Sequence, residues 1–358
     1  MKILFICGSL EAKKDGVGDY TRRVCGQLIK LDYQVEMVSL CDHHVDSYVN
    51  EIQWVEETKV NASRIPIVLS NDKRLLIVQK ILKNFQPDRI SLQFVPYSFN
   101  SKGLPFWLPA FLKKLKGSYK WHIMFHELWL GIDKESSFKH KFIGQLQQII
   151  IKKIVHSIAP HSINTQNKLY QYYLKSILIN AEILPICGNI PLTGLKKENK
   201  IFTQFVLFGT IHIDAPFEDF ISDLIRISSI FAKPLKFIFV GKNGNEVHNY
   251  TKVLEDNFIS YDVLGMQSEK EISEVLVNSD FGISTTPYYQ SEKSGVYAAY
   301  KEHRIHTICV ARKWTPQKGL YTIPNITKYE KNNLNIVSMN IAEVDLCSLA
   351  KQFVHSII

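Results

Sequence analysis

The chain has 358 residues, a formal net charge of +9 and a 46% hydrophobic composition, which excludes a disordered or fibrous protein. Its length exceeds what one hydrophobic core usually supports, so two folded domains are expected. The six cysteines are scattered without a Cys-x-x-Cys pair, which argues against a disulfide framework or a zinc site. No apolar run is long enough to span a membrane, and the opening MKILFICGSL is too short for export, so we expect a cytoplasmic protein.

Short apolar runs alternate with helical patterns through the first half of the chain. The strand-like runs are residues 2–8, 35–40, 65–69, 90–95, 122–126 and 157–159. The helical patterns are residues 19–31, 73–83, 106–116, 139–154 and 166–174. This alternation is typical of a parallel sheet covered by helices on both faces, and it predicts a first Rossmann-like domain over residues 1–190.

Residues 184–200 interrupt the alternation with prolines, glycines and a charged run, so we place a linker at residues 191–203. A second series follows, with strand-like runs at residues 205–208, 236–240, 262–264, 281–284 and 307–310. Its helical patterns are residues 216–230, 270–278 and 294–302. These elements predict a second Rossmann-like domain over residues 204–340. The C-terminal segment 341–358 contains a last helix, which is expected to pack back on the first domain.

The sequence therefore predicts an α/β protein built from two doubly wound domains that face a cleft. Ligands of such sheets bind outside the carboxyl ends of the strands. Polar segments that contain glycine occur at those ends, at residues 9–18, 126–131, 209–215, 241–244, 265–269 and 285–295. The occurrence of such a segment at several strand ends indicates a ligand site more strongly than any single segment does.

Residues 280–310 form the most informative segment, in which a strand, a polar loop, a helix and a second strand follow one another. Ser294, Gly295 and Val296 open the helix, where unpaired amide groups and the positive end of the helix dipole attract anions. Gly295 allows a close approach to a ligand, and Lys293 adds a positive charge. Such a site can bind a diphosphate without a metal. An ordinary turn with a glycine remains the alternative.

The order of several motifs resembles the two-domain nucleotide-sugar glycosyltransferases of the GT-B type, especially the retaining, family 4-like bacterial enzymes of lipopolysaccharide and capsule synthesis. These motifs are DGVGDY (15–20), FHE (125–127), FVLFGT (205–210), FVGKNGNE (239–246), LGMQSEKEISEVLVNSDFGIS (264–284) and SEKSGVYAAY (291–300). The resemblance implies that the second domain binds a nucleoside diphosphate sugar and that the first holds the acceptor.

The resemblance and the glycine-rich loops together assign residues to the donor site. They are Gly16, Gly18, Gly209, Thr210, Lys242, Gly265, Met266, Glu292, Lys293, Ser294, Gly295, Val296 and Tyr300. The chain departs from the family at two places. Tyr300 replaces the second of two glutamates, the one that holds the ribose, and Thr210 and His212 replace a basic pair that neutralises the diphosphate.

The chemistry of sugar transfer requires stabilisation of the leaving diphosphate. No Asp-x-Asp motif occurs in the chain, so we expect no metal and no other cofactor. The expected catalytic residues are His126, Glu127, Glu292 and Lys293. His126 has a structural alternative, a hydrogen-bonded histidine near the core, and Asp19 could cap the helix that follows it. His161 and Asn164 are interpreted as structural.

Residues 104–121 combine aromatic and aliphatic side chains with lysines, a pattern that fits either a membrane interface or a core helix with a basic outer face. The membrane interpretation would place the protein on the cytoplasmic face of the inner membrane, next to a lipid-linked or saccharide acceptor.

Two alternatives to a transferase remain. A nucleotide-sugar 2-epimerase of the same architecture would need carboxylates for proton abstraction and no acceptor. A non-catalytic basic binding protein would use the net charge, but no nucleic-acid module is recognisable, so no nucleic-acid partner is expected. A dinucleotide-dependent dehydrogenase is disfavoured because no Gly-x-Gly-x-x-Gly follows either first strand.

Overall fold

The computed structural model describes residues 1–115, 117–193, 200–336 and 345–358, and its chain divides into two units. The first unit comprises Met1–Ile186, Pro316–Leu320 and Leu346–Ile358, and the second comprises Cys187–Thr315 and Tyr321–Asp345. The predicted linker, 191–203, includes residues 194–199, which lie outside the described residues. Residues 337–344, at the predicted end of the second domain and the start of the C-terminal segment, also lie outside them.

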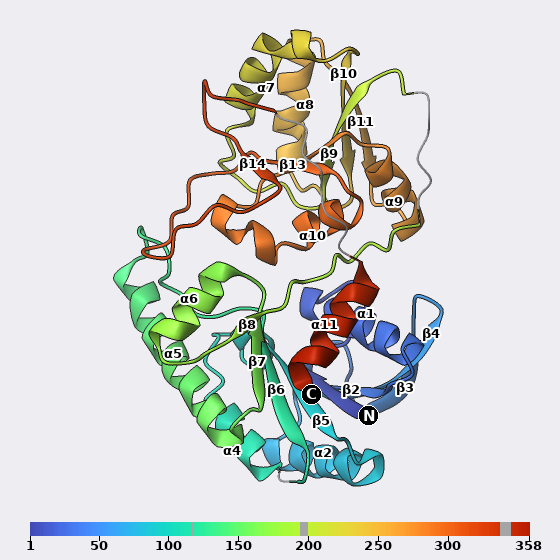
Figure 1. Ribbon diagram of the computed structural model, residues 1–358, viewed down its shortest axis with the longest axis vertical. Helices are drawn as coiled ribbons and strands as arrows, with labels where there is room; N and C mark the ends of the chain where they lie inside the picture. Colours follow the sequence, from blue (N-terminus) through green and yellow to red (C-terminus); the bar gives the residue numbers. More distant parts are fainter. Residues whose placement is uncertain (116, 194–199, 337–344) are drawn as a thin grey trace. The chain divides into compact units, whose positions relative to one another are not determined.

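The first unit is built on an eight-stranded sheet with the order β3-β4-β2-β1-β5-β6-β7-β8 (Figure 1). Its strands are β1 (Lys2–Cys7), β2 (Gln34–Asp42), β3 (Val49–Val55), β4 (Thr58–Pro66), β5 (Arg89–Phe94), β6 (Lys120–Phe125), β7 (Ser162–Thr165) and β8 (Glu182–Ile183). All neighbouring pairs are parallel except β3 and β4. Five of the six β1 residues are buried, as expected for a central strand covered on both faces.

Helices surround this sheet. They are α1 (Gly16–Lys30), α2 (Asn71–Phe85), α3 (Pro96–Phe99), α4 (Leu108–Lys114), α5 (Phe138–Ile158), α6 (Lys168–Ser176) and α11 (Leu346–Ile357). The C-terminal helix α11, red in Figure 1, lies beside α1. The ring of Phe353 in α11 packs 5.2 Å from the ring of Phe5, and the guanidinium of Arg89 donates a 2.7 Å hydrogen bond to the carbonyl of Ile357.

One strand expected in the first unit is absent, and one pair of strands was not predicted. Residues 157–159 do not form a strand, because α5 continues to Ile158 and the strand begins at Ser162. The sequence analysis also missed the antiparallel hairpin of β3 and β4. Its turn consists of Glu56 and Glu57, both with positive φ, at positions where Asn-Gly or Asp-Gly would have signalled a turn.

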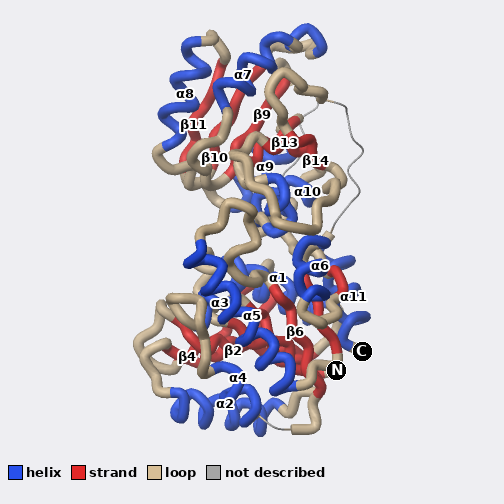
Figure 2. Tube along the Cα trace, turned by 90° about the vertical axis from the view of Figure 1, so that its left-hand side faces the viewer, coloured by secondary structure: helices blue, strands red, loops and turns tan. Residues whose placement is uncertain are grey.

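The second unit is built on a six-stranded parallel sheet with the order β11-β10-β9-β12-β13-β14. Its strands are β9 (Thr203–Phe208), β10 (Leu235–Val240), β11 (Ser260–Gly265), β12 (Phe281–Ser284), β13 (His306–Cys309) and β14 (Ile326–Lys328). Its helices are α7 (Phe217–Arg226), α8 (Glu246–Asp256), α9 (Glu269–Val277) and α10 (Gly295–Glu302), with short 3-10 turns η1 (Ser228–Ile230) and η2 (Tyr288–Lys293). Helices and strands of both units are distinguished by colour in Figure 2.

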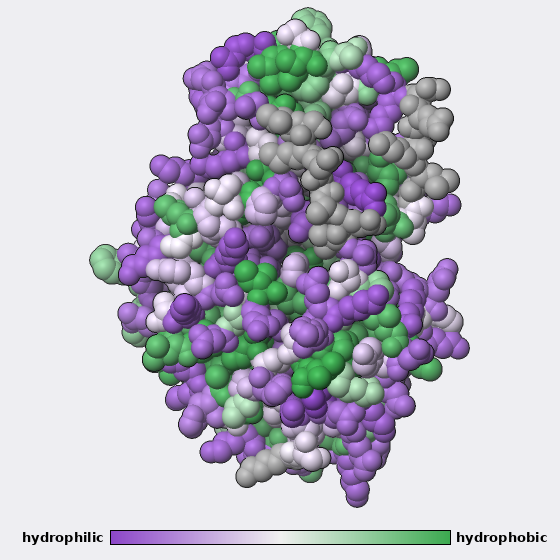
Figure 3. Space-filling view, in the orientation of Figure 1, coloured by the Kyte–Doolittle hydropathy of each residue, from purple (hydrophilic) through white to green (hydrophobic). Residues whose placement is uncertain are grey.

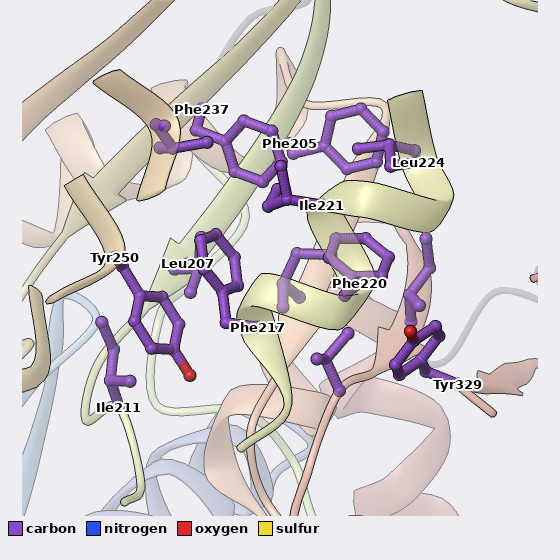
Figure 4. Packing of buried hydrophobic residues seen from close by; sticks show 14 of the residues in the cluster. Phe205, Leu207, Ile211, Phe217, Phe220, Ile221, Leu224, Phe237, Tyr250 and Tyr329 are labelled. Atoms are coloured by element: carbon purple, nitrogen blue, oxygen red, sulfur yellow. The ribbon is translucent and has the colours of Figure 1, made fainter. Parts of the chain in front are cut away.

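Alternate residues of β9 enter two separate cores, one on each face of this sheet. Phe205 and Leu207 pack with α7 and α8, and Figure 4 shows the Phe217 and Phe220 rings of α7 in this cluster. Val206 and Phe208 pack with α9 and α10 on the other face. This period-two division explains why β9 reads as a continuous apolar run in the sequence.

Two connecting segments differ from the sequence-based boundaries. Residues 316–320, expected in the second domain, pack on the first unit, where the amide of Gln317 donates to the carbonyl of Ile132 at 2.8 Å. Gly188, expected in the first domain, packs against α10 of the second unit. A Cβ atom at Gly188 would lie 2.8 Å from the Ala299 Cα, so the close approach of the two backbones requires glycine.

Candidate functional site

The carboxyl ends of β9 and β12 mark the switch point of the second sheet. The chain passes from β9 to β10 and β11 on one side and then returns to β12 on the other side of β9. In open α/β sheets, ligands bind outside the strand ends at such a point. The loops that follow β9 and β12 are therefore the candidate site.

Hydrogen bonds hold these loops together. The His212 amide, after β9, donates to the Thr285 hydroxyl, after β12, at 2.9 Å. Asn243, after β10, is buried, and its side-chain amide donates to the Gly209 carbonyl at 2.9 Å. The Asn243 carbonyl in turn accepts a 3.1 Å bond from the Ile211 amide. The sequence analysis missed Asn243, although the quoted motif FVGKNGNE contains it.

The first turn of α10 lies next to the loop after β9. Gly209 has φ +74°, and a Cβ atom there would lie 3.3 Å from the Val296 side chain. Gly295 is exposed, and the nearest atom to an added Cβ would be the Asn189 Oδ1 at 3.9 Å. The structure thus brings together Gly209, Val296 and Gly295.

Among the described residues, no side chain caps the amino end of α10. Ser294 holds the capping position with extended backbone angles, but its hydroxyl accepts a 3.4 Å bond from the Thr286 hydroxyl instead. In α9, by contrast, the Ser268 hydroxyl accepts from the Glu271 amide. The first amides of an uncapped helix have no intrahelical acceptor, so this end of α10 can receive an anion.

Basic side chains come from three loops around this end of the sheet. Lys293 immediately precedes Ser294, and Lys242 is exposed on the loop after β10. Partial desolvation of this exposed side chain, and then the positive charge of Arg312, lower the pKa of His212 below its usual range. His212 is therefore neutral at neutral pH and does not replace the charge of the family's basic pair.

Arg312 is the basic residue that the sequence analysis missed. It follows β13, whose carboxyl end lies beside that of β12 because Ser284 pairs with Cys309. Its positive charge contributes to the lowered pKa of His212. The sequence contained only a weak signal, an Arg-Lys pair shortly after a strand, at residues 312–313.

Glu292 and Tyr321 form a contact at the end of η2. The Tyr321 hydroxyl donates a short hydrogen bond to the Glu292 carboxylate. The loop of Tyr321 thereby orients the carboxylate that was assigned to the donor sugar.

Tyr300 does not belong to a ribose site, which corrects the sequence-based assignment. Its side chain is fully buried. Its hydroxyl accepts from the Phe208 amide at 3.0 Å and lies 3.1 Å from the carbonyl oxygens of Val206 and Ile283. Tyr300 therefore joins the ends of β9 and β12 from inside the core. Gly282 leaves room for its ring, since a Cβ atom there would lie 2.6 Å from Tyr300.

Gly265 and Met266 lie at the end of β11, the edge strand two positions from β9. The Gly265 carbonyl accepts a 2.7 Å bond from the Gly241 amide, and Met266 is 75% exposed. Their assignment to the donor site stays a prediction.

The amino end of α1 in the first unit differs from that of α10, because it carries its own carboxylate. Asp15 caps the helix by accepting from the amides of Val17 and Gly18 at 2.9 and 2.8 Å. The cap is thus Asp15, and Asp19 instead accepts from the Lys13 amide and pairs with Arg22.

Gly16 and Gly18 have different environments. Gly16 has no atom within 4 Å of an added Cβ, and its assignment to the donor site stays a prediction. Gly18 is buried, and a Cβ there would lie 2.6 Å from the Ser9 carbonyl oxygen. Packing against its own loop therefore requires glycine at position 18, and the assignment of Gly18 to the donor site stays a prediction.

His126 follows β6 and is only 4% exposed. Its Nε2 lies 2.7 Å from the Gln93 Oε1, and its carbonyl accepts from the Gln166 amide group at 2.6 Å. Burial, with a smaller contribution from His122, lowers the pKa of His126 to about 3. The imidazole is neutral at neutral pH, which favours the structural alternative for His126. Glu127 is half-buried, and its catalytic assignment stays a prediction.

His161 and Asn164 were interpreted as structural. Asn164 is buried, and its Oδ1 lies 2.9 Å from the Nε2 of His122. The His161 amide donates to the Trp121 carbonyl at 2.7 Å.

A buried ionic network supports the strand ends of the first sheet, and the sequence analysis missed it. The Arg64 guanidinium contacts Asp42 at 2.9 Å, Glu51 at 3.3 Å and Glu11. Asp42 also accepts from the Leu10 amide at 3.1 Å. Burial alone would raise the pKa of Asp42, but its hydrogen bonds to Arg64 and to backbone amides lower it below its usual range.

The segment 104–121 does not expose an amphipathic apolar face, which corrects its membrane interpretation. Leu108, Phe111 and Leu112 of α4 are 0–4% exposed, and α4 packs on α5. The Trp107 ring lies under the guanidinium of Arg74, at 4.7 Å. Phe106 alone among the aromatic residues of this segment is largely exposed in the described part of the chain. None of the described helices combines the length and apolarity needed to cross a bilayer.

Comparisons with solved structures identify the fold. No family model and no curated protein sequence matches the chain. The UDP-GlcNAc 2-epimerase of Methanocaldococcus jannaschii aligns with a TM-score of 0.53 and 10% identity over 99% of both chains. A glycosyltransferase from Rickettsia africae aligns with a TM-score of 0.52 and 13% identity over 99% of this chain and 87% of its own. The chain has the two-unit GT-B fold of these enzymes, and the predicted fold class is confirmed.

Proposed function

We propose that the protein is a metal-independent, retaining glycosyltransferase that moves a sugar from a nucleoside diphosphate sugar to a saccharide or lipid-linked acceptor in surface-polysaccharide synthesis. The observation that carries the proposal is the uncapped amino end of α10, which adjoins Gly209 at the switch point of the second sheet. Amides, a helix dipole and nearby lysines are the groups that bind a diphosphate without a metal ion. Enzymes of nucleotide sugars share this fold.

In this proposal, the amides of Gly295 and Val296 bind the diphosphate, and Lys293 and Arg312 neutralise its charge. These groups stabilise the negative charge that develops on the diphosphate as the glycosidic bond breaks. The diphosphate oxygen then accepts the proton of the acceptor hydroxyl on the same face of the sugar. Glu292, oriented by Tyr321, binds a hydroxyl of the donor sugar.

Gly295 allows a sharp test of the amide contacts. Ser294 has φ −84° and ψ 124°, angles that suit the residue before a proline, and proline is tolerated at the first position of a helix. Gly295→Pro should therefore fold normally while it removes one amide hydrogen. Gly295→Ala keeps that hydrogen, and the alanine Cβ has room.

The first measurement is a thermal-shift and calorimetry screen of the wild-type protein against UDP, GDP, ADP and CMP, with and without a chelator. For the nucleotide that binds, we expect Gly295→Pro to weaken binding by about 10- to 100-fold, the value of one charge-assisted hydrogen bond. Gly295→Ala should weaken it much less. Equal binding by both variants, or binding that requires a divalent ion, would contradict the proposal.

A nucleotide-sugar 2-epimerase is the second candidate, since the M. jannaschii enzyme aligns over 99% of both chains. Epimerisation requires a side-chain base that removes a proton from carbon. Three carboxylates near the strand ends of the first sheet bind other groups of the protein. Asp15 accepts hydrogen bonds from helix amides, and Asp42 and Glu11 form ion pairs with Arg64. These contacts favour transfer. Incubation with the donor alone separates the two activities, because an epimerase would release or equilibrate the epimer without any acceptor.

A further inference from the structure

Helix α5 of the first unit has an outward face with an unusual composition. Phe138 is 91% exposed, Phe142 61% and Ile149 46%. The helix lies on the outside of its unit in both views (Figures 1 and 2). Apolar groups that line one exposed helix face in this way mark a surface that meets a partner.

The rotation of α5 about its axis is determined by its opposite face. Gln147 is buried, accepts from the Leu130 amide at 2.8 Å and donates to the Gly103 carbonyl at 3.1 Å. Gly144 is buried against the Leu130 carbonyl, so closely that a Cβ would lie 2.0 Å from its oxygen. These contacts, together with the packing of α4 on α5, direct Phe138 and Phe142 outward.

The charges on the same outward face are all positive. On a helix with 3.6 residues per turn, the three apolar side chains fall within about 40° of one another, and the exposed Gln145 lies in the same row between Phe142 and Ile149. Lys141 and Lys152 then lie on one flank of this row, and Lys139 and Lys153 lie on the other. All four lysines are exposed, and α5 contains no acidic residue. The Lys141 ammonium lies 5.7 Å from the centre of the Phe138 ring.

We propose that this α5 face, made of Phe138, Phe142 and Ile149 with their four flanking lysines, docks the protein on an anionic lipid surface. A helix with an apolar row between lysine rows can lie in the plane of a bilayer interface, with its rings among the acyl chains and its ammonium groups at anionic headgroups. Figure 3 colours each residue by hydropathy, and hydrophobic and hydrophilic side chains are interspersed on the side of the molecule that it shows.

Charge argues against the other occupants. A second copy of this chain would bring four lysines against four lysines, and no acidic residue of α5 would compensate them. A nucleic acid would contact the lysines but would have no use for an apolar row at the centre. Two acidic residues, Asp133 and Glu135, lie in the segment before the helix. The backbone of Asp133 forms an isolated β-bridge with that of Pro316.

Co-sedimentation with vesicles tests the proposal on the full-length chain. The wild-type protein should bind phosphatidylcholine vesicles that contain phosphatidylglycerol, should not bind pure phosphatidylcholine vesicles, and should bind less at high salt. Lys152→Gln with Lys153→Gln should lower the partition coefficient about 30-fold, because each lysine contributes about 1 kcal/mol, or about a factor of five. Phe138→Gln with Phe142→Gln should lower it at least about tenfold.

The matched control is Lys113→Gln with Lys114→Gln, which removes two exposed lysines from α4. It should bind vesicles as the wild type does. The substituted side chains are exposed, so thermal unfolding and nucleotide binding should be unchanged in all variants, and the test is independent of the proposed activity.

Absence of wild-type binding to the anionic vesicles would overturn the proposal. Normal vesicle binding by the phenylalanine variant would also overturn it, because binding would then depend on the lysines alone. Such a purely electrostatic contact would fit a nucleic acid equally well. An equal loss in the α4 control would place the surface elsewhere. If sedimentation velocity showed a dimer that the phenylalanine variant dissociates, the face would be a contact between copies.

Discussion

The hydroxyl of Tyr300 provides the clearest test of the second unit, because the ribose-binding role and the structural role predict opposite results. Tyr300→Phe keeps the fully buried ring and removes only the hydroxyl. The Phe208 amide then loses the hydroxyl that accepts from it at 3.0 Å, and the carbonyls of Val206 and Ile283 lose the donor that they share at 3.1 Å.

The size of the effect follows from these contacts. Loss of the accepted and of the donated hydrogen bond from the core costs about 1–2 kcal/mol each. We therefore expect the free energy of unfolding of the second unit to fall by about 2–4 kcal/mol. For a unit of this size, this corresponds to a decrease in the unfolding midpoint of about 5–15 °C.

Scanning calorimetry and hydrogen exchange of the β9 and β12 peptides measure this loss, and nucleotide titration below the midpoint measures binding. The matched control is Tyr297→Phe on the same helix, whose hydroxyl donates to the Pro324 carbonyl at 3.0 Å. It should cost about 1 kcal/mol. Wild-type stability of Tyr300→Phe together with a tenfold loss of nucleotide affinity would refute the structural role.

Three further predictions concern charged groups. Arg312→Gln should raise the pKa of His212, which NMR titration measures. It should also weaken diphosphate binding about tenfold if Arg312 contacts the phosphates. An unchanged pKa of His212 would show that the charge of Arg312 does not act on it. Because burial lowers the pKa of His126 from 6.5 to about 3, only the unfolded state takes up its proton at mildly acidic pH, so this group lowers stability as the pH falls. This group changes the free energy of unfolding by about 1.4 kcal/mol per pH unit. His126→Gln should remove this pH dependence, which urea unfolding at several pH values measures. An unchanged slope of the free energy against pH would contradict the burial of His126. Arg64→Met should lower the free energy of unfolding by about 3–5 kcal/mol at neutral pH, and less at acidic pH, where Asp42 is protonated; a neutral effect would show that the network contributes little.

Local chemistry explains which parts of the site the sequence predicted. The strand–loop–helix segment around Gly295 could be located because an apolar strand, a polar loop and a helix start each leave a pattern within a few residues. The same locality explains the missed hairpin of β3 and β4. Its turn, Glu56 and Glu57, adopts positive φ without the residue types that usually announce it.

The sequence by itself determined the alternation of strands and helices, the division into two units and the position of the glycine-rich strand ends, because these depend on period and on backbone freedom. The tertiary structure alone decided which polar groups are buried and which apolar groups are exposed. Tyr300 and His126 turned inward, and the charge of Arg312, from a distant part of the chain, acts on the pKa of His212. The apolar face of α4 entered the core, while Phe138 and Phe142 of α5 stayed outside. A helix with apolar residues on more than one side does not encode which side is covered, since that depends on the elements that pack against it.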